Sequence, residues 1–268
     1  MIEIPTFRKK IKDFAAAEGR DLPWRRTRDP YRILVSEVML QQTQVERVRT
    51  FYEKFIKQFP DLQSLARSRQ RDVLAAWQGL GYNRRALALR EAARIVVRDH
   101  GGVLPRDRAA LESLPGIGPY TAGALRAFIW GEPEIFIETN IRRAFIHFFF
   151  PRRNLVRDAE LLPLIERSLD RKDPRAWYFA LMDYGAMLGV SAPRNPNRRS
   201  AHHVRQSKFA GSDREIRGKI LRLALAKGRI SRVDLERTIP RSKARIARAA
   251  DALVREGFLR ERNNSLFS

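Results

Sequence analysis

Apolar residues recur at helical spacing through almost all of the first 190 residues of this chain. No convincing run of alternating apolar and polar residues, which a half-buried strand would show, comes before residue 255. Asp29-Pro30 is a helix start signal, because a capping carboxylate precedes a proline in the first turn. The fold class predicted for residues 1–190 is therefore all-α. The stretches expected to be helical are 31–44, 45–58, 71–78, 84–99, 108–113, 119–130, 139–149, 157–170 and 174–188.

The amino-acid composition narrows the function classes. Lysine and arginine total 53 against 30 acidic residues, so the formal net charge is +23, which favours an anionic partner and nucleic acid first. A genome rich in G and C is the alternative source of so much arginine. The absence of cysteine excludes disulfides, Cys-ligated zinc, an ordinary iron–sulfur cluster and a nucleophilic thiol. The four histidines are too scattered for a metal site: His100, His147, His202 and His203.

The sequence shows neither a membrane-spanning segment nor a secretory signal. No long uninterrupted apolar run spans a bilayer, and the N-terminal residues lack the order of a secretory signal. We therefore expect a soluble, cytoplasmic protein.

The composition changes after residue 190. Residues 191–212 are basic and rich in proline and asparagine, which predicts an irregular linker. Residues 213–268 read as three helical stretches followed by a hairpin at Asn263-Asn264, the pattern of a winged helix-turn-helix DNA-binding domain. A protein-interaction module of three helices is the alternative. The cations near the leading end of the expected recognition helix, 242–256, are Arg241, Lys243, Arg245 and Arg248.

A glycine-rich turn between two helical stretches, residues 114–122, carries the most specific local motif. Gly116 and Gly118 permit backbone conformations that let a ligand come close, and the turn leads straight into a helix N-terminus. The exposed N–H groups and the helix dipole there favour an anion. This is the helix-hairpin-helix pattern, which grips a DNA phosphate without reading sequence. Tyr120 and Thr121 belong to the same predicted backbone contact.

Residues 20–190 resemble the helix-hairpin-helix DNA glycosylases, and most closely the adenine glycosylases of the MutY type. The resemblance implies a monofunctional enzyme of base excision repair that hydrolyses the N-glycosidic bond of adenine opposite guanine or 8-oxoguanine. Its partner would be double-stranded DNA with a mismatched or damaged base pair, bound by a monomer at the nucleoid. The motifs that carry the resemblance are Leu22-Pro23-Trp24-Arg25, Ser36-Glu37-Val38-Met39-Leu40-Gln41-Gln42-Thr43-Gln44-Val45, Gly79-Leu80-Gly81-Tyr82, the turn at 114–122, and Leu181-Met182-Asp183-Tyr184-Gly185-Ala186-Met187.

The resemblance also implies catalytic residues. Glu37 would protonate the adenine ring and later activate water, which needs a carboxyl group held neutral by burial. Glu138, one methylene longer than the family's aspartate, would stabilise the oxocarbenium-like sugar, although it could simply cap the following helix. Tyr120 stands where bifunctional relatives have lysine, so no Schiff base and no lyase route are expected from that position.

Further positions follow from the same resemblance. Gln42 and Tyr82 match the wedge residues that fill the base stack, and Gln41 shares this predicted role. The positions expected to line the base pocket are Arg20, Leu22, Trp24 and Phe179.

The sequence departs from the family's pattern in three ways. The four cysteines are missing, so the family's [4Fe–4S] cluster is expected to be absent, with Arg194, Arg198 and Arg199 taking over its contact with the DNA backbone. Phe179 replaces a glutamine or glutamate that faces the adenine, which favours the rival prediction of a mismatch thymine or uracil glycosylase. The family's C-terminal domain is not recognisable. A catalytically silent DNA-binding protein is the rival from another class.

Overall fold

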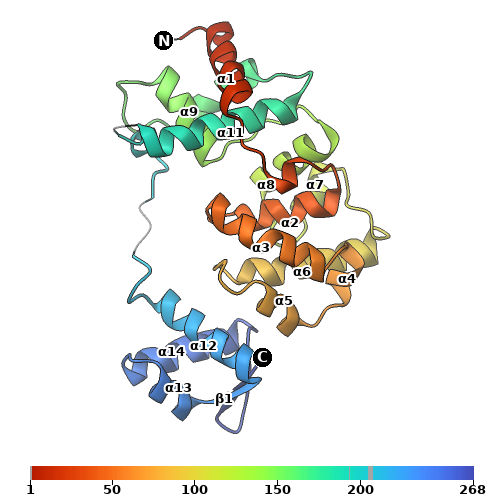
Figure 1. Cartoon of the computed structure of the whole chain (residues 1–268), viewed down its shortest axis with the longest axis vertical. Helices are drawn as coiled ribbons and strands as arrows, with labels where there is room; N and C mark the ends of the chain where they lie inside the picture. The colour runs from red at the N-terminus through yellow and green to blue at the C-terminus, as the bar shows by residue number, and fades with distance from the viewer. Residues whose placement is uncertain (1, 193, 205–207) are drawn as a thin grey trace. The chain divides into compact units, whose positions relative to one another are not determined.

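The computed structural model describes residues 2–192, 194–204 and 208–268 (Figure 1). These residues form two compact units, each built from two stretches of chain. The first unit contains residues 1–42 and 98–205, and the second contains residues 43–97 and 206–268. Parts of the expected linker, 193 and 205–207, lie outside the described residues. The domain boundaries expected at 190 and 212 stay a prediction.

The first unit is a helical assembly, as the periodicity predicts. Its central contact joins α9 (Thr139–Phe149) to α11 (Pro174–Ser191), and α11 also packs on α1 (Ile4–Glu18). Gly185 permits this close approach, because a Cβ there would lie 2.1 Å from the backbone oxygen of Asn140. The other elements are η1 (Pro23–Arg25), α2 (Pro30–Leu40), α7 (Arg108–Glu112), α8 (Pro119–Leu125), the π-helical turn η2 (Arg126–Trp130), α10 (Asp158–Ser168) and η3 (Pro196–Arg199).

An aromatic cluster closes the core of this unit. The ring of Phe7 meets those of Phe145, Phe149 and Trp177 edge-on, with centroids 5.0, 5.1 and 5.9 Å apart. Such edge-to-face pairs favour burial beyond their apolar area alone. Helix α1 is absent from the predicted helices because its buried face carries only Phe7 and Ile11 among many charged residues.

The second unit combines a helical part with a small sheet. Glu256, after the last helix, pairs with Arg217 at 2.7 Å and with Arg84 at 2.8 Å. These ion pairs join helices from both stretches of chain within the unit. The elements are α3 (Val45–Gln58), α4 (Leu62–Arg67), α5 (Gln70–Ala76), most of α6 (Arg84–Asp99), α12 (Asp213–Lys227), β1 (Arg229–Ser231), α13 (Arg232–Thr238), α14 (Lys243–Arg255), β2 (Arg260–Arg262) and β3 (Ser265–Phe267).

The last stretch has the winged helix-turn-helix arrangement that the sequence predicts. The strand order is β1-β3-β2 with both pairs antiparallel, and Leu266 is in register with Ile230 on one side and Glu261 on the other. Asn263 and Asn264, with φ of 47° and 55°, form the hairpin turn. Strand β1 was not expected, because three residues are too short to display an alternating pattern.

One predicted helix end and one predicted irregular segment are wrong. Helix α2 ends at Leu40 and does not continue to residue 44, because Gln42 has a φ of 55°. The linker is also less irregular than expected, since η3 lies within it and Val156 forms a parallel bridge with Ser200. The cap of α2 agrees with the sequence, because the carboxylate of Asp29 accepts the N–H of Arg32 at 2.8 Å.

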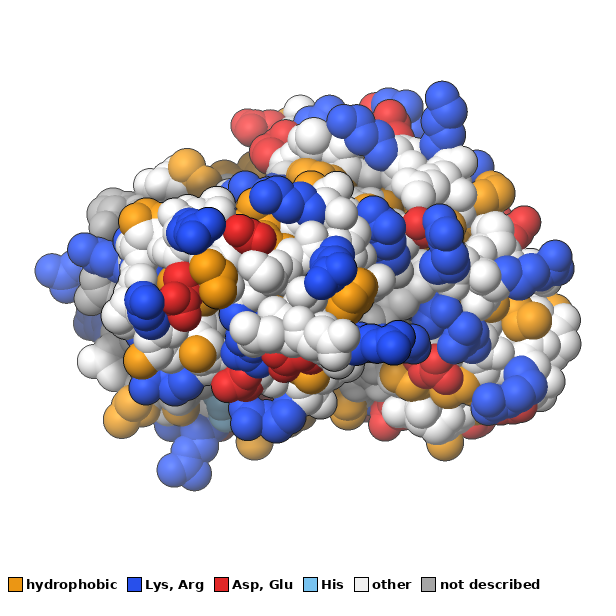
Figure 2. All heavy atoms as spheres, turned by 90° about the horizontal axis from the view of Figure 1, so that it is seen from below, with side chains coloured by type: hydrophobic (Ala, Val, Ile, Leu, Met, Phe, Trp, Pro, Cys, Tyr) orange, Lys and Arg blue, Asp and Glu red, His pale blue; other side chains and the backbone are white. Residues whose placement is uncertain are grey.

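The surface reflects the composition. On the face drawn in Figure 2, Lys and Arg side chains are dispersed and outnumber Asp and Glu. Within the described residues, no helix combines the length and the apolar character that crossing a bilayer requires.

Candidate active site

Glu37 is a buried carboxyl group in the middle of α2. Only 4% of the residue is exposed, and its helix also buries Leu34, Val35 and Val38. The Tyr120 hydroxyl donates to Glu37 Oε2 at 3.2 Å. Burial raises the pKa of Glu37 to about 7; the Tyr120 hydrogen bond opposes the rise, Glu138 adds to it and Arg25 opposes it. The carboxyl group is therefore divided between its neutral and ionised forms near neutral pH.

Glu138 is held at the N-terminus of α9. Its Oε1 accepts the N–H groups of Asn140 and Ile141, both at 2.7 Å, and Oε2 accepts from Asn140 Nδ2 at 3.2 Å. Burial raises the pKa of Glu138, and the two backbone hydrogen bonds work against that rise. The helix cap that the sequence offers as an alternative role is thus present. It also fixes the carboxylate in one orientation, so capping and catalysis are compatible.

The glycine-rich turn lies beside these carboxyl groups in the first unit. Gly116 has a φ of 81°, and Gly118 precedes the first turn of α8 with extended backbone. Gln41 Nε2 donates to the Gly116 carbonyl at 3.0 Å and to Thr121 Oγ1 at 3.2 Å. Gln41 therefore links the end of α2 to the turn, whereas the sequence predicts a wedge role for it.

The two main wedge candidates share an unusual backbone. Gln42 and Tyr82 have φ values of 55° and 48°, which non-glycine residues adopt at a cost and mostly at functional sites. Gln42 is exposed, and 38% of Tyr82 is exposed. Gln42 belongs to the first unit and Tyr82 to the second. Each residue by itself is therefore exposed on an unusual backbone, and the wedge role of both stays a prediction.

A buried ion cluster includes Arg20 and contacts Phe179, two of the residues predicted to line the base pocket. Asp183 accepts from Arg20 Nε at 2.6 Å and from both terminal nitrogens of Arg25 at 2.7 and 2.8 Å. Burial works to raise the pKa of Asp183, but the hydrogen bonds and charges of Arg25 and then Arg20 hold it below its usual range. The Arg25 guanidinium lies 4.4 Å from the ring centre of Phe179. Asp183 is thus a structural anchor for both arginines.

The remaining pocket candidates differ in exposure. Leu22 and Trp24 are buried in the core, while Phe179 is half-buried and packs on Phe128 at 4.6 Å. Arg25 was missing from the predicted site residues, although it lies inside one of the motifs that carry the resemblance. Its position between Asp183 and Phe179 could not be read from residue spacing.

Some of the cations expected to contact the DNA backbone are exposed, and others are held by residues of the chain itself. Arg194 and Arg198 are exposed. Arg199 instead donates to the carbonyl groups of Phe150, at 2.7 Å, and Pro151 near the C-terminus of α9, so its guanidinium has a structural role there. In the winged part, Lys243 pairs with Glu236 at 3.2 Å and Arg245 with Asp213 at 2.6 Å, while Arg248 is exposed. Contact of these cations with DNA stays a prediction.

The residues in place of the family's cluster do not fit a [4Fe–4S] group. Such a cluster needs thiolate ligands, and the chain has no cysteine. Hydrogen bonds hold this segment instead: Arg143 Nε donates to Asn195 Oδ1 at 3.1 Å, and Asn197 Nδ2 donates to the Thr139 carbonyl at 2.9 Å. Across the described ranges, no group of three or more acidic or histidine side chains is arranged to hold a metal ion.

Comparisons with known proteins agree with this geometry. A family model described as "HhH-GPD superfamily base excision DNA repair protein" matches residues 35–241. The adenine DNA glycosylase of Mycobacterium tuberculosis (strain CDC 1551 / Oshkosh) is 34% identical over 265 residues, covering 88% of this chain and 86% of that protein. The thymine/uracil-DNA glycosylase of Methanothermobacter thermautotrophicus is 32% identical over 194 residues, covering 71% and 86%. The solved structure of a thermostable thymine-DNA glycosylase superposes with a TM-score of 0.65 at 29% identity, covering 74% and 93%.

Proposed function

The chain belongs to the HhH-GPD superfamily of base excision DNA repair proteins and is a DNA glycosylase, and we propose that it releases adenine mispaired with guanine or 8-oxoguanine. The observation that carries the proposal is the buried Glu37 carboxyl, with a pKa of about 7 and a hydrogen bond from Tyr120. Release of a purine from DNA needs a proton on its ring, and a neutral carboxyl group at physiological pH can supply that proton.

The proposed reaction has two proton transfers. After the target base leaves the stack, the neutral Glu37 gives its proton to a ring nitrogen of adenine, and the bond between the base and C1′ breaks. The ionised Glu138 stabilises the positive charge that develops on the sugar. The Glu37 carboxylate then takes a proton from the water that adds to C1′, which restores the starting enzyme. The products are free adenine and an abasic site.

We propose that the enzyme has no lyase activity, cluster or metal requirement. Tyr120 stands where bifunctional relatives have lysine, and a phenol cannot form the Schiff base that a lyase reaction needs. Burial raises the pKa of Tyr120 well above its ordinary value, so this side chain keeps its proton and remains a hydrogen-bond donor to Glu37. A single copy of the chain would act on mismatched duplex DNA at the nucleoid.

Removal of thymine or uracil opposite guanine is the second candidate reaction. The half-buried Phe179 favours it, because phenylalanine can stack on a base but cannot hydrogen-bond a base edge. Similarity to a thymine/uracil-DNA glycosylase supports it as well. The motif over residues 36–45 and the similarity to adenine DNA glycosylases support the adenine proposal.

A panel of duplexes decides between these reactions. We expect alkali-dependent strand cleavage of duplexes with adenine opposite 8-oxoguanine or guanine, and none with thymine or uracil opposite guanine. No strand should break without alkali, and a chelator should leave the rate unchanged. Cleavage confined to the thymine and uracil duplexes would establish the second candidate, and cleavage before alkali would refute the lyase-free proposal. A chain that binds these duplexes but releases no base would be a silent DNA-binding protein.

The winged part is proposed to add a second contact with the duplex. Arg248 lies exposed on α14, and Arg260 and Arg262 lie exposed on the first strand of the wing. We expect Arg248→Glu to weaken binding to any duplex by about fivefold to tenfold and to reduce the salt dependence of binding, because a phosphate contact is lost. Fluorescence anisotropy at several salt concentrations measures both. Arg222→Glu reverses the charge of an exposed arginine on α12 outside the proposed contact and is the matched control. An unchanged affinity for the Arg248 variant would contradict the proposed contact.

A further inference from the structure

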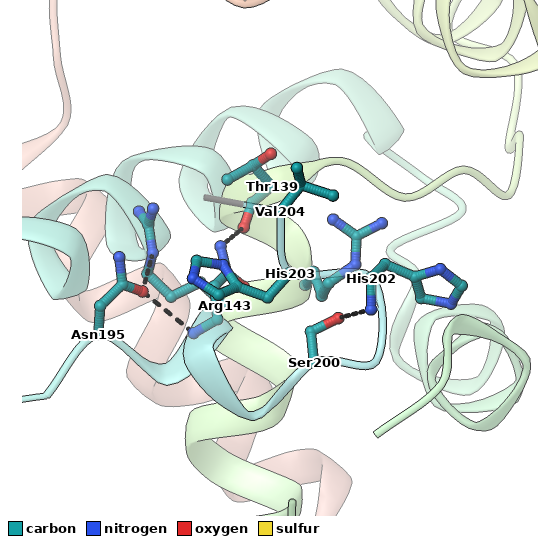
Figure 3. A pocket seen from close by; sticks show the side chains of 9 residues that line it. Thr139, Arg143, Asn195, Ser200, His202, His203 and Val204 are labelled. Atoms are coloured by element: carbon teal, nitrogen blue, oxygen red, sulfur yellow. Dashed lines mark hydrogen bonds between the residues drawn. The ribbon is translucent and has the colours of Figure 1, made fainter. Parts of the chain in front are cut away.

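A polar cavity of about 320 Å³ opens beside the N-terminus of α9 (Figure 3). Its wall combines side chains of α9 with side chains from residues 195–204, the segment that stands where the family's cluster would be. Among the described residues that line it, two are arginines, two are histidines and none is acidic. This composition is that of an anion site.

The two arginines of the wall differ in their partners. Arg142 makes a double contact with the carboxylate of Asp158, with both distances 2.7 Å. Arg143 donates to the side-chain oxygens of Asn140 and Asn195 at 2.8 and 3.1 Å, and these acceptors are neutral. Within the described ranges no carboxylate forms an ion pair with Arg143. Glu138 attracts the Arg143 guanidinium from the far side of the Asn140 amide, but it makes no direct contact with it, so Arg143 can also attract an external anion.

Asn197 provides an independent observation in the same wall. It is 6% exposed, and its Oδ1 atom is buried with no hydrogen-bond donor among the described residues. A buried acceptor without a partner is unfavourable, so this oxygen favours a ligand or an ordered water that brings a donor to it. Water that bridges Asn197 to an anion satisfies both groups. The buried Ser200 hydroxyl can donate directly to such an anion.

We propose that this cavity binds a backbone phosphate of the substrate strand next to the target nucleotide. The inference rests on the proposed function. Thr139 of the wall directly follows Glu138, the carboxylate that would face the sugar of that nucleotide. A phosphate held by Arg143 and Ser200 would therefore lie within one nucleotide of C1′. The site would anchor the target strand with side chains that this chain carries in place of the family's cluster segment.

Val204 offers a way to test the site without disturbing its buried members. It lines the cavity and is 85% exposed, so a charged side chain is tolerated there. Val103 is 71% exposed in the same unit and does not line the cavity, which makes Val103→Glu the matched control. The probe is a duplex that carries an uncharged abasic-site analogue, because both candidate reactions leave an abasic site.

We expect Val204→Glu to weaken binding of this duplex by about tenfold and to lower the slope of log K against log salt by about 1, because one phosphate contact is lost. Val204→Lys should tighten binding, and Val103→Glu should change it by less than about twofold. Single phosphates of the duplex can be replaced by neutral methylphosphonates. At one position beside the abasic analogue, this replacement should weaken binding by the unsubstituted chain but should not weaken binding by the Val204→Glu chain any further.

Two results would refute the proposed phosphate site, and a third would refute the proposed function. Equal effects of Val204→Glu and Val103→Glu would overturn the site. So would methylphosphonate losses that are the same for the Val204→Glu and unsubstituted chains at every position. If the unsubstituted chain fails to prefer the abasic duplex over an unmodified one, the proposed function itself fails.

Discussion

Glu37→Gln is expected to reduce the rate of base release by at least about 10³-fold while leaving duplex affinity within about twofold. Glutamine fills the same space but can neither give a proton to the adenine ring nor take one from water. Each of these acid–base steps contributes about 10²–10⁴-fold in enzymes. Single-turnover release of adenine from a duplex with adenine opposite 8-oxoguanine measures the rate, and anisotropy measures the affinity.

A matched variant and a stability measurement serve as controls for this result. Glu53→Gln changes an exposed glutamate on α3 and should leave the rate unaltered. The Glu37→Gln protein should melt no lower than the unsubstituted chain at pH 8, because an ionised carboxyl group in this buried site opposes folding. Base release that survives in the Glu37→Gln protein would refute the assigned mechanism.

The pH profile gives a second readout of the same residue. Glu37 acts first as an acid and must be protonated, so the single-turnover rate should fall as pH rises through about 7. Removing the Tyr120 hydroxyl removes a hydrogen bond that lowers the pKa of Glu37. Tyr120→Phe should therefore move the alkaline fall in rate to higher pH. A profile that is flat between pH 6 and 9 would contradict Glu37 as the acid.

Local patterns in the sequence predict part of this site well. The apolar neighbours of Glu37 on a predicted helix indicate its burial, and the glycines at 116 and 118 indicate the turn. These properties depend on residues that are close together in the chain. The helix spacing and the hairpin at Asn263-Asn264 also predict most elements of the fold.

Contacts between distant residues could not be predicted in this way. The hydrogen bond between Tyr120 and Glu37 joins residues 83 positions apart, and the pairing of Arg25 with Asp183 spans 158. The Asn197 Oδ1 atom has no hydrogen-bond partner among the described residues because the segment expected to be an irregular linker packs on α9 and buries it. Composition identifies such a segment as basic and irregular, but only its tertiary contacts reveal a cavity.

Glu138 has two roles that substitutions at this position can separate. As the N-cap of α9, it needs only an oxygen that accepts the N–H groups of Asn140 and Ile141, which an amide can also supply. As the group that stabilises the charged sugar, it needs a negative charge. We therefore expect Glu138→Gln to fold and to bind duplex normally, but to release adenine about 10²–10³-fold more slowly.

The length of the side chain provides the final test of this assignment. Glu138→Asp keeps the charge and restores the residue of the resembled family, with one methylene less reach, so it should retain far more activity than Glu138→Gln. Both variants should show similar melting temperatures, since aspartate and glutamine can each accept the capping N–H groups. If instead Glu138→Gln is as active as the unsubstituted chain, the carboxylate caps α9 and does nothing for the sugar. If both variants lose activity and melt early, the cap dominates, and the electrostatic role is refuted as the main cause of the loss.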